Sequence, residues 1–103
     1  MTTIGFLQDK WQPFAKPGSW NDPDMLIVVM VGFGKNIIST HLSPDEQYTH
    51  ITLWSFLAAP LLIGCDLEQM DVVSLNLLSN SEVIAINPDI AGIQGSSVYA
   101  DNN

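Results

Sequence analysis

The sequence predicts an α/β fold in which parallel strands alternate with helices. Two short runs, 25–31 and 61–65, are apolar at every position. Because neither run alternates between apolar and polar residues, each is expected to be a strand covered on both faces, as in parallel sheets sheathed by helices. A helix start lies between them, and the order strand, helix, strand, helix is typical of a βαβ unit. Two strands cannot form such a sheet alone, so the chain should be part of a larger one.

The chain before the first strand carries weak signals. Residues 1–14 are mixed in character and allow no more than a short helix or a turn. Turn residues at 17–19 then lead into the first strand. Glycines at both ends of 32–34 end that strand, and a loop is expected to continue to Leu42.

Local capping signals predict the helices. Ser43 as N-cap, Pro44 at the first helical position and Glu46 at the third predict a helix from Pro44 to about Ala58. Pro60 stops it, and the second strand follows as far as Asp66.

Two shorter helices are expected after the second strand. Asp71 can cap one that runs through Leu78, and Asn80-Ser81 can start another. From Asn87 onward the chain is rich in Gly, Pro, Ser and Asn, which predicts a linker or a frayed end.

The composition excludes some partners. The formal charge is −8, with three lysines and no arginine, which argues against nucleic acid and anionic membrane surfaces. Hydrophobic residues make up 47% and charged residues only 14%, so a chain this small should need neighbours to cover its apolar surface. The uncharged stretch 48–65 is interrupted by polar residues and is too short to span a membrane. No secretory signal follows Met1, so a cytoplasmic location is the default expectation for this chain, although a parent enzyme could be secreted.

No cofactor or metal site is predicted. The single Cys65 reads as a buried, inert thiol, and neither a CxxC pair nor a Cys/His cluster is present. His41 and His50 have no catalytic or ligand partner at a meaningful spacing and are assigned structural roles. Gly32 and Gly34 form a GxG without the rest of a dinucleotide fingerprint.

Asp22 and Asp24 are the obvious chemical candidates. In an extended chain they would share one face about 6.5 to 7 Å apart. They are still not expected to be a glycosidase pair, because two carboxylates from one strand lie on the same side of a bound sugar. Asn-Asp-Pro-Asp also suits a turn, so the motif is interpreted either as part of a binding site or as a turn. Trp20 beside them could stack on a sugar or pack in a core.

Several blocks of the sequence resemble the α-galactosidase (melibiase) family in order and spacing. They are Pro17-Gly18-Ser19-Trp20-Asn21-Asp22-Pro23-Asp24-Met25-Leu26, Thr52-Leu53-Trp54, Ala58-Ala59-Pro60-Leu61-Leu62-Ile63, Asn76-Leu77-Leu78 and Glu82-Val83-Ile84-Ala85-Ile86-Asn87. The likeness covers about residues 4–95. The chain departs from the family pattern after Asn87, where Asn-Pro-Asp-Ile-Ala-Gly replaces the usual Asn-Gln-Asp-Pro-Leu-Gly, and the C-terminal β-sandwich is not present in these residues.

The resemblance implies the C-terminal portion of a (β/α)₈ TIM barrel, comprising strand 7, helix 7, strand 8 and helix 8. Residues 1–95 would form this part of the barrel and 96–103 a linker or disordered tail. By position, Asp24 resembles the carboxylate at the end of strand seven that holds sugar hydroxyls, and Met25 its neighbour in the pocket. Trp20 and Asp22 join them as substrate-binding candidates.

The implied activity is that of a retaining enzyme that removes terminal α-linked galactose. The nucleophile and the acid/base lie upstream in the family, so no catalytic residue is assigned here and the chain alone should be inactive. Its partners would be the α-galactoside substrate and the remainder of the barrel. The number of subunits is not assigned. The alternatives are a fragment of an α-N-acetylgalactosaminidase and a non-catalytic remnant that binds carbohydrate or a protein partner.

Overall fold

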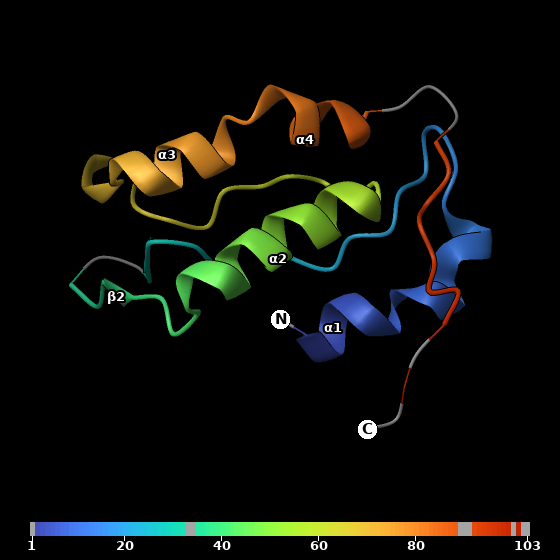
Figure 1. Ribbon diagram of the computed structural model, residues 1–103, viewed down its shortest axis with the longest axis horizontal. Helices are drawn as coiled ribbons and strands as arrows, with labels where there is room; N and C mark the ends of the chain where they lie inside the picture. The colour runs from blue at the N-terminus through green and yellow to red at the C-terminus, as the bar shows by residue number, and fades with distance from the viewer. Residues whose placement is uncertain (1, 33–34, 89–91, 100, 102–103) are drawn as a thin grey trace.

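The computed structural model describes residues 2–32, 35–88, 92–99 and 101. In chain order the elements are α1 (Thr2–Phe6), the 3-10 helix η1 (Leu7–Phe14), β1 (Met30–Val31), β2 (Ile38–Ser39), α2 (Pro44–Phe56), the 3-10 helix η2 (Leu67–Gln69), α3 (Val72–Leu78) and α4 (Ser81–Ile86). Helix α2 lies centrally in Figure 1 and packs against α1, α3 and α4. The result is a small α/β arrangement built around α2. Among the described residues, no helix has the length and apolar character needed to cross a membrane.

The predicted start of α2 is confirmed. The Ser43 hydroxyl accepts a hydrogen bond from the Glu46 N–H (3.3 Å), and the Glu46 carboxylate accepts one from the Ser43 N–H (2.7 Å). This reciprocal pair satisfies two backbone donors and holds the pKa of Glu46 below its ordinary value. The helix ends at Phe56, and Ala58 turns the chain away with a positive φ of 52°.

Both shorter helices also begin at their predicted caps. The Asp71 carboxylate accepts the Ser74 N–H at 2.7 Å at the start of α3. The Asn80 side chain accepts two N–H groups at the start of α4. These caps act on groups two or three residues away, which is why sequence alone identifies them.

The N-terminal residues are more helical than expected. Helices α1 and η1 together occupy 2–14, so the prediction of no more than a short helix or turn is wrong. Gly5 explains the close approach of α1 to α2, because a Cβ there would lie 2.3 Å from Leu53 and 2.9 Å from Trp54. Pro13 is tolerated because its fixed φ suits a 3-10 turn.

The two predicted strands pair in parallel. Leu26 donates its N–H to the Leu62 carbonyl oxygen and accepts from the Gly64 N–H, both at 2.8 Å. A further bond joins the two segments, because the Met30 carbonyl oxygen accepts the Asp66 N–H at 2.9 Å, two residues beyond the register set at Leu26. The predicted parallel contact is therefore confirmed, but only as one bridge between Leu26 and Ile63, and 61–65 does not form the regular strand that was expected.

The first segment is less regular than predicted. Val29 has a positive φ of 62°, which interrupts the ladder, and beyond it β1 pairs antiparallel with β2. Leu26 and Val28 are 2% and 0% exposed, whereas Met25 and Ile27 are 39% and 40% exposed. Within the described residues helices cover one face and the other lies open, so coverage of both faces stays a prediction for the larger sheet.

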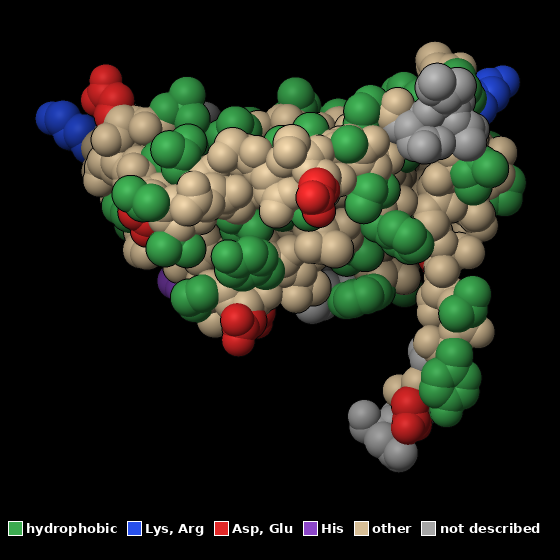
Figure 2. Space-filling view, turned by 45° about the horizontal axis from the view of Figure 1, so that its top comes forward, with side chains coloured by type: hydrophobic (Ala, Val, Ile, Leu, Met, Phe, Trp, Pro, Cys, Tyr) green, Lys and Arg blue, Asp and Glu red, His purple; other side chains and the backbone are tan. Residues whose placement is uncertain are grey.

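The core lies between α2 and the two extended segments. Its buried apolar side chains are Leu26, Val28, Ile51, Trp54, Leu57, Ala59 and Leu77. Many other large apolar side chains remain exposed, and Figure 2 shows them distributed over the molecular surface with few charges between them. The described residues thus bury a small core and leave much apolar surface free.

The segment after the last helix packs against the N-terminal region (Figure 1). The Gln94 side chain is 2% exposed; it donates to the Gln8 carbonyl oxygen (2.9 Å) and accepts from Asn21 Nδ2 (3.0 Å). The Gly95 N–H donates to the Phe56 carbonyl oxygen at 2.9 Å. The expectation of a linker or frayed end from Asn87 onward is therefore wrong for these residues. The proposed division at residue 95 stays a prediction.

Candidate functional site

A cavity of about 550 Å³ opens on the uncovered face of the paired segments. Asp24 and Met25 line it beside the first segment, and Cys65 and Asp66 line it at the end of the second. Most of the remaining wall is apolar, with Ile4, Ile27, Val31, Ile37 and Ile63 among its members. An apolar pocket with a few convergent polar groups is the usual form of a small-molecule site.

Asp24 has a strained backbone that is held in place by neighbouring groups. Its φ is 85°, in the left-handed region that aspartate visits more readily than most residues. Its N–H donates to Asp22 Oδ1 (2.9 Å), and its own Oδ1 accepts from the Met25 N–H (2.7 Å). Of the Asp24 carboxylate atoms, Oδ1 alone is hydrogen-bonded within the described residues, so Oδ2 can accept from a ligand.

This geometry corrects two expectations about the acidic pair. The positive φ of Asp24 means that it and Asp22 do not share one face of an extended chain. Asp24 also does not end a strand, because the parallel pairing begins after it, at Leu26. Asp22 makes a side-chain turn onto the Asp24 N–H and is not among the residues that line the cavity.

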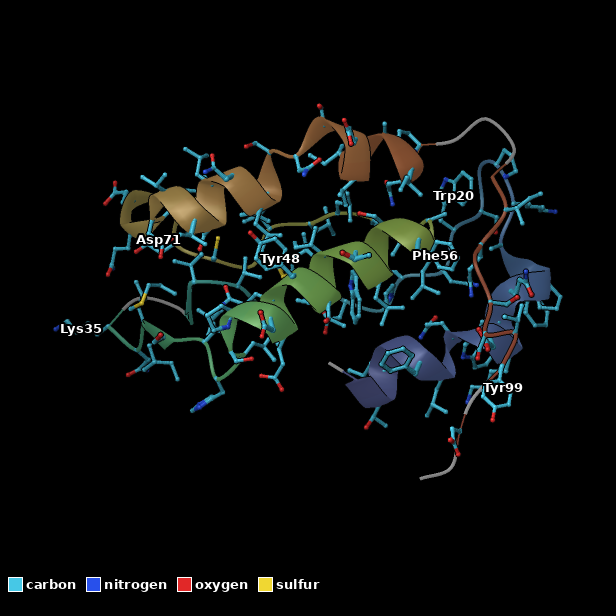
Figure 3. All side chains as sticks on the ribbon, viewed as in Figure 1. Trp20, Lys35, Tyr48, Phe56, Asp71 and Tyr99 are labelled. Atoms are coloured by element: carbon cyan, nitrogen blue, oxygen red, sulfur yellow. The ribbon has the colours of Figure 1, made fainter. Side chains whose placement is uncertain are left out.

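The sequence-predicted site residues separate into two places. Met25 lines the same cavity as Asp24 and is 39% exposed. Trp20 is 41% exposed and lines a different cavity with Ala58 and Pro60, near the C-terminal end of α2 (Figure 3). A substrate-binding role for Trp20 and Asp22 stays a prediction, and the cavity itself holds Asp24 and Met25.

The sequence reasoning missed the contribution of α2 to this site. Trp54 Nε1 donates to the Asp24 carbonyl oxygen at 2.8 Å, and His50 Nε2 accepts from the Ile27 N–H at 3.0 Å. The two rings meet edge to face with centroids 4.2 Å apart. Burial lowers the pKa of His50 to about 4, so the imidazole is neutral and can act as an acceptor. The available signal was the spacing of His50 and Trp54, four residues apart on the buried face of one helix.

Asp66 was also missed as a candidate site residue. Asp24 precedes the first paired segment and Asp66 follows the second, so the two acidic residues line the cavity at opposite ends of a parallel pair. Asp66 Oδ1 accepts from the Glu68 N–H and its Oδ2 from Gln69 Nε2, each at 3.0 Å. These bonds fix the side chain at the start of η2.

Cys65 is half-buried and lines the cavity, so the thiol is less buried than expected. Burial, together with the nearby Asp66 carboxylate, raises the pKa of this thiol. It is therefore protonated at neutral pH and is a weak nucleophile. In the described ranges, no cluster of three or more His, Cys, Asp or Glu side chains could hold a metal ion.

Comparison with known proteins gives the family. The family model described as "Alpha galactosidase A", of the melibiase group, matches residues 2–89. The chain belongs to the alpha-galactosidase (melibiase) family. Alpha-galactosidase 2 of Arabidopsis thaliana is 50% identical over 103 residues, which are 100% of this chain and 24% of that protein. Human alpha-N-acetylgalactosaminidase is 38% identical over 96 residues, covering 93% of this chain and 21% of that protein.

A solved structure of another member supports the fold. A putative alpha-galactosidase/melibiase from Bacteroides fragilis superposes with a TM-score of 0.87 and 37% identity, over 98% of this chain and 22% of that one. The resemblance stated from sequence motifs is therefore confirmed at the level of the family. The chain spans about a quarter of the length of these alpha-galactosidase relatives.

Proposed function

We propose that the chain is the sugar-holding C-terminal part of an α-galactosidase barrel, contributing strand 7, helix 7, strand 8 and helix 8. The cavity on the open face of the parallel pair carries this proposal, because it brings Asp24 and Met25 to an apolar hollow. In a closed barrel that face would point inward, and α2 already covers the opposite face as the outer helices of such barrels do.

Asp24 would bind the sugar and take no part in bond cleavage. Strained backbone conformations persist where the surroundings over-determine them, and they cluster at ligand sites. Asp24 combines such a conformation with a carboxylate oxygen available to accept hydroxyl hydrogens. Met25 would supply apolar contact to the same ring.

The chain alone would be inactive, because double displacement needs a nucleophile and an acid/base about 5 to 5.5 Å apart. Asp24 and Asp66 line the cavity at opposite ends of the paired segments, and the Asp66 carboxylate caps η2. We therefore assign both catalytic carboxylates to the rest of the barrel.

A chimeric enzyme tests this proposal. The chain replaces the matching quarter of the Arabidopsis relative, to which it is 50% identical. We expect hydrolysis of p-nitrophenyl α-galactoside, and Asp24→Ala should lower kcat/KM by about a hundredfold or more, as expected when a charge-assisted hydrogen bond is lost. Asp45→Asn, on the exposed first turn of α2, is the matched control and should leave kcat/KM unchanged. Near-normal kcat/KM in Asp24→Ala would refute the role of Asp24.

The same chimera distinguishes between the two activities represented among the relatives. Human alpha-N-acetylgalactosaminidase matches nearly the whole chain, so an N-acetylgalactosaminide is the second candidate substrate. Comparing kcat/KM for p-nitrophenyl α-galactoside and the corresponding N-acetylgalactosaminide shows whether this chain changes the substrate preference of the Arabidopsis enzyme into which it is inserted. We propose that it does not, because Asp24 and Met25 would hold sugar positions common to both substrates.

A further inference from the structure

Three polar side chains on one face of α2 hydrogen-bond the backbone that carries Asp24. They are Gln47, His50 and Trp54, spaced three and four residues apart, so helical geometry stacks them in a row. The bonds run from Trp54 Nε1 to the Asp24 carbonyl oxygen (2.8 Å), from the Ile27 N–H to His50 Nε2 (3.0 Å) and from the Val29 N–H to Gln47 Oε1 (3.3 Å).

The bonds made by Trp54 and Gln47 join the two residues of this segment that have a strained backbone. Asp24 and Val29 have φ values of 85° and 62°, and Val29 is β-branched, for which this conformation is a genuine outlier. Such conformations are unfavourable in themselves and persist only where the surroundings hold them. The helix side chains supply that restraint at both ends of the segment.

The middle bond has a defined donor and acceptor. The His50 and Trp54 side chains are 1% and 2% exposed, so water has little access to their ring atoms, although both bonds are only part-buried. Because His50 Nε2 accepts the Ile27 N–H, the proton of the neutral ring lies on Nδ1. The edge-to-face contact between the two rings fixes them relative to one another.

We infer that Trp54, His50 and Gln47 are positioning residues that hold the Asp24 backbone in its left-handed conformation for sugar binding. This role rests on the proposed function of Asp24. None of the three needs to contact the reacting atoms, because each acts through the backbone of 24–29. Loss of one bond should let the segment relax toward an ordinary extended conformation and turn the Asp24 carboxylate away from the sugar.

Amide hydrogen exchange in the full chain tests the row of bonds directly. In His50→Leu the Ile27 amide should exchange at least about tenfold faster than in the wild type, because its buried acceptor is gone. His50→Gln offers an amide oxygen as acceptor and should restore most of the protection. His41→Leu is the control, because His41 is exposed. Equal protection of Ile27 in the wild type and His50→Leu overturns the inference.

A double-mutant cycle in the chimeric enzyme tests the link to Asp24. Trp54→Phe keeps an aromatic ring but loses the indole donor, and it should raise KM about tenfold, the factor for roughly one hydrogen bond. In an Asp24→Asn background the same change should alter KM less than about threefold, because coupled residues are not additive. A merely structural role would give equal factors in both backgrounds, and that result overturns the inference. Trp11→Phe, which removes an exposed indole from η1, should leave KM unchanged.

The two readouts separate failure of this inference from failure of the proposed function. If Asp24→Asn leaves kcat/KM normal, sugar binding by Asp24 is refuted, and the positioning role falls with it. The exchange experiment then still reports whether α2 holds the segment. If Asp24→Asn is impaired but Trp54→Phe is not, Asp24 binds the sugar without help from α2.

Discussion

The buried His50 side chain forms its hydrogen bond with a backbone N–H and not with a ligand. Its Nε2 accepts the Ile27 N–H, and its Nδ1 has no hydrogen-bond partner among the described residues. A charged ring would lose this acceptor and would be buried without a counter-ion, and this cost is why burial lowers its pKa. The sequence could not reveal this role, because the partner N–H lies 23 residues away on the chain.

The pKa of His50 predicts a pH-dependent stability. The ordinary pKa is 6.5 and the folded value is about 4, so the unfolded chain binds a proton first as pH falls. The contribution of His50 is complete above pH 6.5, declines between pH 6.5 and 4, and is lost below pH 4. The whole loss should be at most about 3 kcal/mol.

Urea unfolding of the dilute chain between pH 7.5 and 4 measures this dependence. Glu46 and Asp71 also have lowered pKa values, so they too weaken the fold as the pH falls. The difference between the wild type and His50→Gln isolates the histidine, since both proteins keep those acids. If the free energy of unfolding changes with pH in the same way in both proteins, His50 does not titrate as described.

Among the elements, helices α2, α3 and α4 were predictable because their capping signals are local, whereas α1 and η1 carry no such signal and were missed. The Ser43 capping box and the Asp71 and Asn80 caps act within three residues, and each starts a helix where expected. The strands were predicted only in outline, because pairing depends on remote residues and on the break at Val29. The cavity escaped prediction in the same way: Asp66 and Trp54 join Asp24 only through the fold.

Removing the cap of α2 should weaken the fold. Ser43→Ala removes the acceptor for the Glu46 N–H and should lower the free energy of unfolding by about 1 kcal/mol. Ser81→Ala is a fair control, since Ser81 is exposed and follows the N-cap of α4. Urea titration of the two variants compares them, and equal losses would mean that the Ser43 cap contributes nothing specific.

The C-terminal segment should be an integral part of the fold. Gln94 bonds to residues 73 and 86 positions away, which explains why a composition typical of linkers misled the sequence analysis. Gln94→Leu should cost about 2 kcal/mol, because it leaves the Asn21 amide and the Gln8 carbonyl without a buried partner.

Gln69→Leu provides the comparison for Gln94→Leu. Gln69 is exposed and bonds to the Asp66 carboxylate, so its loss should change the free energy of unfolding by less than about 0.5 kcal/mol. Urea unfolding of both variants checks the pair. A Gln94→Leu protein as stable as Gln69→Leu would mean that the segment is only loosely attached.

As a whole, the molecule is a flattened piece of 40 × 35 × 24 Å with one face of its parallel pair open. Met25, Ile27 and Ile63 are 39% to 44% exposed on or beside that face. Such a surface should bind hydrophobic dyes and promote association of the isolated chain. Ile27→Lys should lower dye fluorescence more than Val98→Lys does, although Val98 is 98% exposed, because Val98 does not line the cavity. Equal dye binding by both variants would mean that the open face is not the site of binding.

We propose that this chain contributes sugar binding to an α-galactosidase barrel and does not contain the catalytic carboxylates. The most direct test measures hydrolysis of p-nitrophenyl α-galactoside by the isolated chain and by the chimeric enzyme at equal concentration. We expect turnover by the chimera and only the uncatalysed rate from the isolated chain. Turnover by the isolated chain that disappears on Asp24→Ala or Asp66→Ala would contradict this proposal, because the chain would then contain its own catalytic carboxylates.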